Sequence, residues 1–554
     1  MSINHQSSEE MRELYNSTLW GCAWFSWYDF PRYDSVLLVG DVPEIAVRES
    51  NRIFARVFKY DECIQKDDIE FSVILVFGGY NRKKNEIFLQ KLKRLLSANG
   101  VMLWGADNKL GTRFLCGDKH LGIEGEYFTL ATWKDMFTKA DIELTKIYCL
   151  MPDWHMVKRM YAKEPSAIDK SCLHYIDPQN IIRNEAELLE DVLEGKMFSK
   201  MANAFLFEYR RDNQKNNLLE VQFSPTKGRK ESSVLQLYPD KVVKSSLYDG
   251  GSVKHIYENG ESLRAVNINV IQQRYEEKEM IMPYINAPLV SKVMVETAIS
   301  SVLEFRAMLE KFWQCILQSA ERANVSDFPV DKIKSNNILK KAYIDMVPTN
   351  AFYVNGEYVF FDQEYCYENY PAEYVMFRAL LVLYNNEKIL ENIISLDDVK
   401  KWFDLEESWP YFYDYEVNVL QHDLLKWDIY GKYYQSTGVN QATVRKNRNI
   451  VSHLSDFYES NLFVDVEKKK IILFGAGAYC DRYLERYEKK YLPVYIVDND
   501  ISKWHKYKND IEILPPYNLE KENFKYIRII ICARDSISIE KQLQCMGIKD
   551  YRVF

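Results

Sequence analysis

Short apolar runs alternate with amphipathic segments in the first third of the chain. Residues 36–40 and 71–77 are almost wholly apolar and are bounded by polar residues, as in strands that are buried on both faces. Apolar residues recur at helical spacing over 87–96, before another apolar run at 101–104. This alternation of strands and helices predicts a doubly wound α/β domain over residues 1–165.

The pattern changes to period-two alternation, rich in β-branched residues, after residue 217. The expected strands are 220–223, 233–237, 241–244, 268–275 and 279–284, and the expected helices are 252–263 and 295–323. Strands followed by helices in this order predict an α+β domain over 218–438, with a connecting segment at 166–217.

A third, small domain is expected at 468–554, after a linker at 439–467. Its first strand runs into Gly475-Ala476-Gly477, and Asp498 follows Gly477 by 21 residues. At this distance the acid of a Rossmann unit meets a ribose hydroxyl, so Gly475, Gly477 and Asp498 are candidate contacts for a nucleotide or nucleotide-sugar. The alternative is a packing or oligomerisation module that only keeps the glycine turn.

Asp345, Asn350 and Asp362 have the residue types and the order of a phosphoryl-transfer centre. Such a centre needs a carboxylate for the attacking hydroxyl, an Asn ligand for magnesium, and a second carboxylate that carries the metal over the phosphates. Asn355-Gly356 predicts a hairpin over 353–361 that returns Asp362 to the catalytic loop. The alternative is structural: Asp345 caps a turn and Asp362 ends a strand.

Upstream residues complete the order of a kinase-like fold. Lys244 ends the run Val242-Val243-Lys244, where a strand lysine of this fold clamps nucleotide phosphates. The helix that follows offers Glu258, or alternatively Glu261, as the ion-pair partner of the lysine, and 282–285 is the expected hinge. This order predicts ATP and Mg²⁺ as cofactors.

Composition narrows the class of partners. The net charge of -8, from 72 Lys and Arg against 80 Asp and Glu, argues against binding to nucleic acid or to an anionic membrane. The ten cysteines form no C-x-x-C pair, which favours reduced thiols in a cytoplasmic protein over a zinc site or disulfides. Neither a signal peptide nor a membrane span is expected, so any association with the inner face of a membrane is peripheral.

The N-terminal third also resembles a known family. The runs VLLVG, FSVILVFGG and FLQKLKRLLSANGVMLWGADNKLGTRFLCGDKHLG are similar to the class I S-adenosylmethionine-dependent methyltransferase domain of bacterial surface-polysaccharide enzymes. The resemblance implies that Asn108, Asp118 and His120 face the active cleft, with Gly40 and Asp61 at S-adenosylmethionine. Asp61 and His120 are alternatively solvated loop residues. The first strand lacks the G-x-G turn after it, so we expect a degenerate member.

Two further segments, FFDQEY and YPAEYVMFRALLVLY, resemble the kinase-like half of bifunctional methyltransferase-kinases. That family modifies or terminates bacterial polysaccharide chains such as the O-antigen of lipopolysaccharide. The resemblance implies a kinase that phosphorylates a sugar hydroxyl and a methyltransferase that caps the phosphate. The C-terminal domain resembles the small nucleotide-binding module appended to many polysaccharide-biosynthesis proteins.

The sequence therefore predicts a multidomain α/β chain with a degenerate methyltransferase-like Rossmann domain, a protein-kinase-like α+β domain and a small Rossmann-like domain. The leading hypothesis is an ATP-dependent phosphotransferase that acts on a glycan or sugar acceptor, coupled to methylation. One alternative is a non-catalytic scaffold that recruits a glycosyltransferase. Another is a methyltransferase with an inactive kinase-like domain. The sequence allows an oligomer and does not define its size.

Overall fold

The chain folds into two units, 1–443 and 444–554, in a computed structural model. The structure describes residues 19–28, 30, 35–60, 70–79, 82–119, 127–169, 172–212, 214, 216–224, 232–247, 251–329, 333, 335, 337–421, 439, 441–448 and 461–554. Two residues predicted to form the methyltransferase-like site, Asp61 and His120, lie outside these ranges. Each unit is described by itself below.

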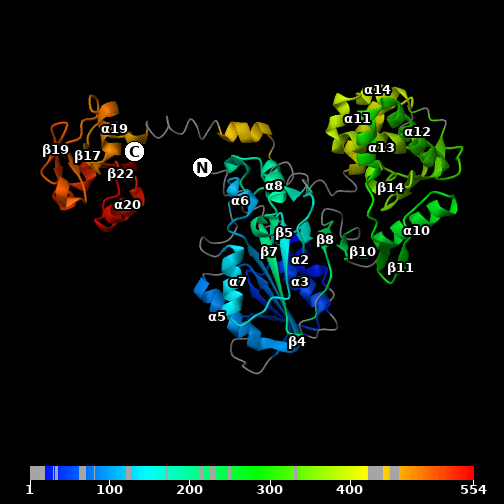
Figure 1. Ribbon diagram of the computed structural model, residues 1–554, viewed down its shortest axis with the longest axis horizontal. Helices are drawn as coiled ribbons and strands as arrows, with labels where there is room; N and C mark the ends of the chain where they lie inside the picture. The colour runs from blue at the N-terminus through cyan, green and yellow to red at the C-terminus, as the bar shows by residue number, and fades with distance from the viewer. Residues whose placement is uncertain are drawn as a thin grey trace. The chain divides into compact units, whose positions relative to one another are not determined.

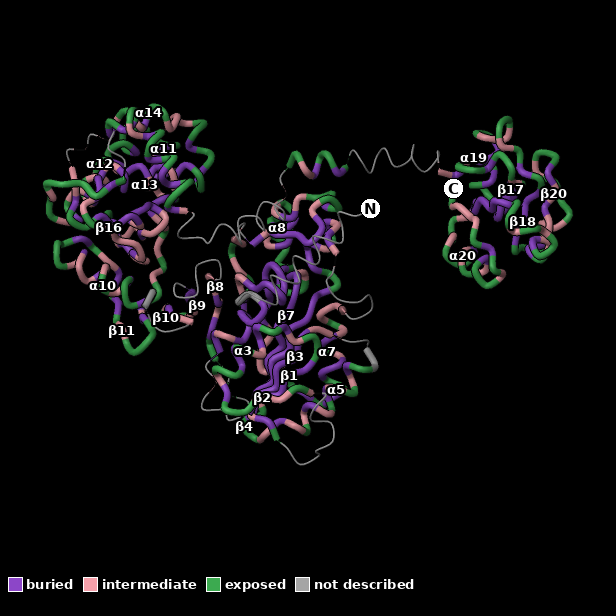
Figure 2. Tube along the Cα trace, turned by 180° about the vertical axis from the view of Figure 1, so that it is seen from behind, coloured by how far each residue is buried: buried purple, intermediate pink, exposed green. Residues whose placement is uncertain are grey.

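An open, mostly parallel sheet forms the N-terminal part of the first unit. Its strands run in the order β2-β1-β3-β4-β7-β5-β6, and β1, β2, β3 and β4 are parallel. Figures 1 and 2 show α3 on one side of the sheet and α5 with α7 on the other. The elements are η1 (Leu19–Cys22), α2 (Ala23–Ser26), β1 (Ser35–Gly40), α3 (Glu44–Ile53), β2 (Arg56–Lys59), β3 (Phe71–Phe77), α5 (Arg82–Leu95), β4 (Leu96–Asp107), α6 (Thr112–Leu115), α7 (Leu130–Lys139), β5 (Lys146–Met151) and β6 (Arg159–Tyr161).

The segment 166–217, which we expected to be a connector, belongs to this sheet. It contains η3 (Pro178–Asn180), α8 (Glu185–Glu194), α9 (Phe198–Met201) and β7 (Ala204–Arg210). Strand β7 pairs antiparallel with both β4 and β5, and six of its seven residues are buried. The run AFLFEYR is apolar enough for a central strand, so the expected boundary at residue 165 is corrected.

The sheet continues into a small antiparallel lobe. Strand β6 pairs with β8 (Glu220–Phe223), and β9 (Ser233–Leu237), β10 (Lys241–Ser246), β12 (Glu279–Pro283) and β11 (Arg274–Glu276) follow in order. Helix α10 (Gly251–Ala265) packs on these strands through Val253 and Ile256. The first three expected strands are confirmed, whereas the strand expected at 268–275 is regular only at its end.

A helical lobe follows. The long helix expected at 295–323 is two helices, α11 (Val290–Ser300) and α12 (Val302–Gln318), because Ser301 leaves the helical conformation and caps α12 through Glu304 N–H. The remaining elements are β13 (Ile338–Tyr343), η4 (Pro348–Asn350), β14 (Ala351–Val354), β15 (Glu357–Phe360), β16 (Cys366–Pro371), α13 (Ala372–Asn386), η5 (Lys388–Asn392), α14 (Leu396–Lys401), α15 (Trp409–Tyr415) and the π-helical η6 (Glu416–Leu420). One apolar core joins them, as the buried segments in Figure 2 show.

The predicted hairpin is present as β14 and β15. Asn355 and Gly356 form its turn with φ of 51° and 83°, the left-handed conformation that a two-residue type I′ turn requires. The hairpin ends at Phe360, two residues before Asp362. The turn therefore sets the position of the predicted metal ligand.

The second unit contains a doubly wound sheet of its own, in the order β19-β20-β18-β17-β21-β22. Strands β17, β18, β20, β21 and β22 are parallel, and β19 is antiparallel to β20. Its elements are β17 (Lys470–Phe474), α19 (Ala478–Tyr487), β18 (Tyr495–Val497), η7 (Ile501–Lys503), β19 (Tyr507–Lys508), β20 (Ile511–Leu514), η8 (Pro516–Lys521), η9 (Phe524–Tyr526), β21 (Ile527–Ile531), α20 (Ser536–Cys545) and β22 (Tyr551–Val553).

A buried ion-pair cluster stabilises the loops at one edge of the N-terminal sheet. The Arg113 guanidinium on α6 lies 2.6 Å from Asp118 Oδ2 and also pairs with Asp153. Asp118 accepts hydrogen bonds from the backbone N–H groups of Ile176 and Asp177 as well. The cluster thus joins three chain segments: the loop after α6, the loop at Asp153 and the segment at 176–177.

We expect Arg113→Met to lower the free energy of unfolding of this unit by about 3–5 kcal/mol, because the change leaves two carboxylates buried without their cation. Denaturant unfolding measures the change. The control is Arg183→Met, since Arg183 is half exposed and pairs with Asp191 at 3.4 Å; its effect should stay within about 0.5 kcal/mol. Equal stability of the two variants would contradict the structural role of the cluster.

Candidate phosphotransfer site

Lys244 and Asp362 form an ion pair between the small lobe and the helical lobe. Strand β10 places the Lys244 side chain in the interior, where only 6% of it is exposed, and Nζ binds Asp362 Oδ1. Asp362 has a φ of 53°, a left-handed conformation that Asp adopts more readily than most residues. This backbone directs the carboxylate toward the lysine, so two residues far apart in the sequence meet.

Asp345 follows β13 and lies beside the segment that carries Asp362. Its Oδ2 accepts hydrogen bonds from the backbone N–H groups of Glu364 at 3.1 Å and Tyr365 at 2.8 Å. Arg378 on α13 lies 3.4 Å from Oδ1. The carboxylate is therefore held in one orientation while 16% of its side chain stays exposed.

Burial raises the pKa of Asp345 to about 6, and the nearby carboxylates of Asp362 and Glu364 act in the same direction. Arg378 and the Tyr365 N–H group oppose this shift. Arg378 is fixed in turn by Glu416, whose Oε2 accepts from Arg378 Nε at 3.0 Å and from the Tyr374 hydroxyl at 2.7 Å. A carboxylate with a pKa near neutrality is suited to receive a proton from a hydroxyl.

Asn350 lies on the same loop and is oriented by Asp345. Its Nδ2 donates to the Asp345 carbonyl at 3.3 Å, which directs its amide oxygen away from that carbonyl. The Gln363 side chain donates to the same carbonyl at 3.0 Å. The loop that carries Asp345 and Asn350 is thus bound to the segment that carries Asp362.

The residue types fit Mg²⁺, which takes oxygen ligands and usually binds through one or two carboxylates together with substrate phosphates and water. Asn350 and Asp362 would supply the protein oxygens. Among the residues that the structure describes, no three His, Cys, Asp or Glu side chains gather in a metal-binding group. A metal bound mainly by nucleotide phosphates does not need such a group.

The ion pair predicted between Lys244 and Glu258 is wrong. Glu258 is half exposed on α10, where it pairs with Lys254 at 3.6 Å and with His255 at 3.7 Å. Glu261, the alternative, pairs with Arg264 on the same helix. Helical spacing of three or four residues favours these local partners over a lysine on β10.

Asn259, which the sequence analysis did not single out, links α10 to the site instead. Its Nδ2 donates to the carbonyl oxygens of Gln363 at 2.9 Å and Glu364 at 3.3 Å. The contact joins the helix of the small lobe to the residues that bind Asp345. The only sign of this role in the sequence was that Asn259 is a polar residue next to Glu258, the expected partner of Lys244.

Asn108 and Asp118 do not face an open cleft, contrary to the expectation from the methyltransferase resemblance. Asn108 is fully buried, and its Nδ2 donates to the carbonyls of Lys200 and Ala202 at 2.9 and 2.7 Å. Asp118 belongs to the Arg113 cluster. Both side chains hold loops together. Gly40 has a φ of 94°, and a Cβ there would lie 2.2 Å from the Phe77 carbonyl oxygen, so the backbone at the end of β1 requires a glycine.

The glycine turn of the second unit is present, but its acid points inward. Gly475 has a φ of 105°, and a Cβ there would lie 2.6 Å from the Cys532 carbonyl oxygen. Asp498 Oδ2 accepts from Ala476 N–H at 2.7 Å and pairs with Lys503 at 3.0 Å. The acid therefore binds the turn before Gly477 rather than presenting both oxygens to a ribose.

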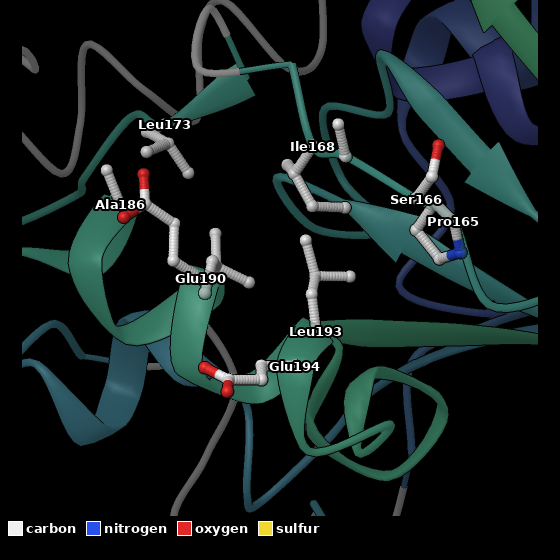
Figure 3. Close-up of a pocket in the computed structure, with 10 residues that line it drawn as sticks. Pro165, Ser166, Ile168, Leu173, Ala186, Glu190, Leu193 and Glu194 are labelled. Carbon is white, nitrogen blue, oxygen red and sulfur yellow. The ribbon is translucent and has the colours of Figure 1, made fainter.

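A cavity of about 400 Å³ lies between α8 and the segment 165–168 (Figure 3). Ile168, Leu173 and Leu193 point into it, and Glu190 and Glu194 lie at its rim. An apolar floor with carboxylates at the edge does not suit a phosphate. This cavity is therefore not a candidate nucleotide site.

The C-terminal part of the chain is similar to a known family. Residues 467–554 match the family model described as C2185-like, N-terminal, which coincides with the strands and helices of the second unit from β17 onward. A search of the curated proteins gives no match.

Several solved structures resemble parts of the chain. A SAM dependent methyltransferase from Archaeoglobus fulgidus is 12% identical over 36% of this chain and 94% of its own, with a TM-score of 0.22. RSP in complex with beta-NADH is 18% identical over 22% of this chain and 65% of its own, with a TM-score of 0.14. Spectinomycin phosphotransferase APH(9)-Ia, in complex with ADP and spectinomycin, is 13% identical over 36% of this chain and 89% of its own, with a TM-score of 0.17. The chain is a multidomain α/β protein, and its site is defined by the contacts described above.

We expect Lys244 and Asp362 to be energetically coupled in the absence of ligand. A double-mutant cycle with Lys244→Met and Asp362→Asn should give an interaction energy of about 1–3 kcal/mol, because each single change removes this ion pair and leaves the other charge partly buried. Denaturant unfolding of the four proteins measures it. Additive effects of the two changes would show that the ion pair does not join the lobes.

Proposed function

We propose that the protein transfers a phosphoryl group from ATP to a hydroxyl of a small or glycan acceptor. The observation that carries this proposal is the convergence of Lys244, Asp345, Asn350 and Asp362 in one site, joined by hydrogen bonds and an ion pair. Their chemistry is that of a phosphate clamp, a base and metal ligands in a protein-kinase-like domain. The main work of such a site is positioning and charge stabilisation.

Each residue has one part in the proposed reaction. Lys244 would leave Asp362 to bind nucleotide phosphates, and Asp362 and Asn350 would hold Mg²⁺, which would offset the negative charge of the phosphates. Asp345 orients the acceptor hydroxyl and takes up its proton as the new P–O bond forms and the bond to the leaving phosphate breaks. Arg378 and the two backbone N–H groups stabilise the ionised form of Asp345 before the acceptor binds.

The acceptor is proposed from the residues that follow Asp362 and from the family resemblance. Gln363-Glu364 follows Asp362 where protein kinases have Phe-Gly, which favours a small-molecule or glycan acceptor. We propose a sugar hydroxyl in surface-polysaccharide assembly on the family resemblance alone.

The helices in the described part of the chain include none with the length and apolar character of a membrane span.

Methyl transfer from S-adenosylmethionine is the second proposal for the first unit. The parallel order of β2, β1, β3 and β4 supports a methyltransferase-like Rossmann domain. The inward positions of Asn108 and Asp118 favour a degenerate one. The scaffold alternative differs from both proposals because it requires neither Mg²⁺-ATP nor S-adenosylmethionine to bind.

Asp345→Asn should lower ATP-dependent phosphorylation of a hydroxyl acceptor by about 10²–10⁴-fold, because the amide cannot accept the proton. Transfer of labelled phosphate measures the rate. Asp327→Asn is the matched control, since Asp327 is an exposed acid of the same lobe that binds Asn369 at 2.7 Å. Undiminished transfer by Asp345→Asn would reject the assignment of the base.

The rate should also depend on pH through Asp345. Since burial raises its pKa to about 6, the carboxyl is protonated and inactive at lower pH. The value of kcat/KM should fall as the pH decreases below about 6 and should level off above about 7. A flat profile between about pH 5 and about pH 8 would contradict the role of Asp345 as the base.

A further inference from the structure

A second cavity lies at the carboxyl ends of the parallel strands of the first unit, well apart in the sequence from the residues of the phosphotransfer site. Strand β1 pairs with β2 on one side and with β3 on the other, so the chain winds outward from β1 in both directions. Open α/β sheets bind ligands at such a switch point, outside the carboxyl ends of the strands. The cavity begins at Gly40 and Asp41, where β1 ends, and has a volume of about 660 Å³.

The walls of this cavity come from β2 and α5. Lys59 and Tyr60 lie at the end of β2, and α5 contributes Lys84, Ile87, Phe88 and Lys91. The four residues of α5 stand at positions i, i+3, i+4 and i+7, which share one face of a helix. Figure 2 shows α5 beside the strands of this sheet. The helix therefore presents two cations and two apolar side chains to one space.

Two aromatic rings of the cavity lie in contact with each other and close to one of its lysines. The rings of Tyr60 and Phe88 meet edge to face with centroids 5.2 Å apart, and Lys91 Nζ lies 5.1 Å from the centre of the Tyr60 ring. This arrangement places a lysine beside an aromatic wall. A ligand with a flat ring on one side and an anionic group on the other matches it.

The charge of the described lining selects against the sulfonium cofactor. The described lining carries Lys59, Lys84 and Lys91 and one acid, Asp41, in a chain whose net charge is -8. S-adenosylmethionine carries a positive sulfonium and a positive ammonium against one carboxylate, so a cationic pocket repels it. A diphosphate is attracted by the same lysines.

We propose that this cavity binds a nucleoside diphosphate or a closely related phosphorylated ring compound, with its phosphates at Lys59, Lys84 and Lys91 and its ring at Tyr60 and Phe88. The site is separate from the Lys244 site and does not depend on phosphotransfer there. Its ligand would take the place of S-adenosylmethionine, so this proposal is an alternative to methyl transfer in the first unit. The volume is adequate, since pockets for ligands of this size span about 300–1,000 Å³.

Calorimetric titration of the full-length protein tests the site with ADP, pyrophosphate and S-adenosylmethionine as probes. ADP is titrated into Lys244→Met, in which the phosphotransfer site is weakened, and into the same variant carrying Lys59→Gln or Lys91→Gln. Lys134→Gln on α7 is the matched control, because Lys134 is an exposed lysine outside the cavity. Pyrophosphate reports the contribution of the phosphates without the base.

We expect ADP to bind the Lys244→Met protein, and each cavity lysine variant to weaken that binding at least about 10-fold, in line with the loss of one charge-assisted contact. Lys134→Gln should leave it unchanged. Pyrophosphate binding that falls in the same variants supports the site with the phosphates as the main contact. The proposal is overturned if ADP does not bind, if ADP binding is equal in all lysine variants, or if S-adenosylmethionine binds and its affinity changes in Lys59→Gln or Lys91→Gln.

Discussion

The ion pair between Lys244 and Asp362 is the interaction on which the central site depends. A lysine that exposes 6% of its side chain requires a partner of opposite charge, and the left-handed backbone at Asp362 provides one. The three residues that follow Asp362 hold the rest of the site, because their backbone groups bind Asp345 and Asn259. A short segment thus joins a strand, a helix and the loop that carries Asp345 and Asn350.

The residues that follow Asp362 also explain why Asp345 is tolerated in a nearly enclosed position, because their backbone N–H groups donate hydrogen bonds to its carboxylate. Burial favours the neutral form of Asp345, and its pKa rises to about 6. Arg378 stabilises the ionised form in place of part of the lost water, and it is held by Glu416, which also accepts a hydrogen bond from Tyr374. Glu416 lies on a π-helical turn, a feature that is often found at functional sites. The site therefore balances a proton acceptor near neutrality against the cost of burying it.

Local sequence signals predicted much of this arrangement. Asn355-Gly356 predicted the hairpin, and the apolar run before Lys244 predicted the strand that carries this lysine. Both features depend on residues that are close together in the sequence. The predicted partner of Lys244 was wrong, because Glu258 pairs with a neighbour on its own helix and not with a lysine on a distant strand. Arg378, Glu416 and Asn259 act through contacts between elements far apart in the sequence, which periodicity does not reveal. The roles of Asn108 and Asp118 also required the buried loops that surround them.

The most direct test of the account is the affinity of the full-length protein for ATP in the presence of Mg²⁺, measured by calorimetry for wild type, Lys244→Met, Asp362→Asn and Lys241→Met. Lys241 is an exposed lysine on the same strand and serves as the control. The account predicts that the first two variants bind at least about 10-fold more weakly than wild type and the control, because each loses a charged contact to phosphate or metal. Equal affinity in all four proteins would contradict it.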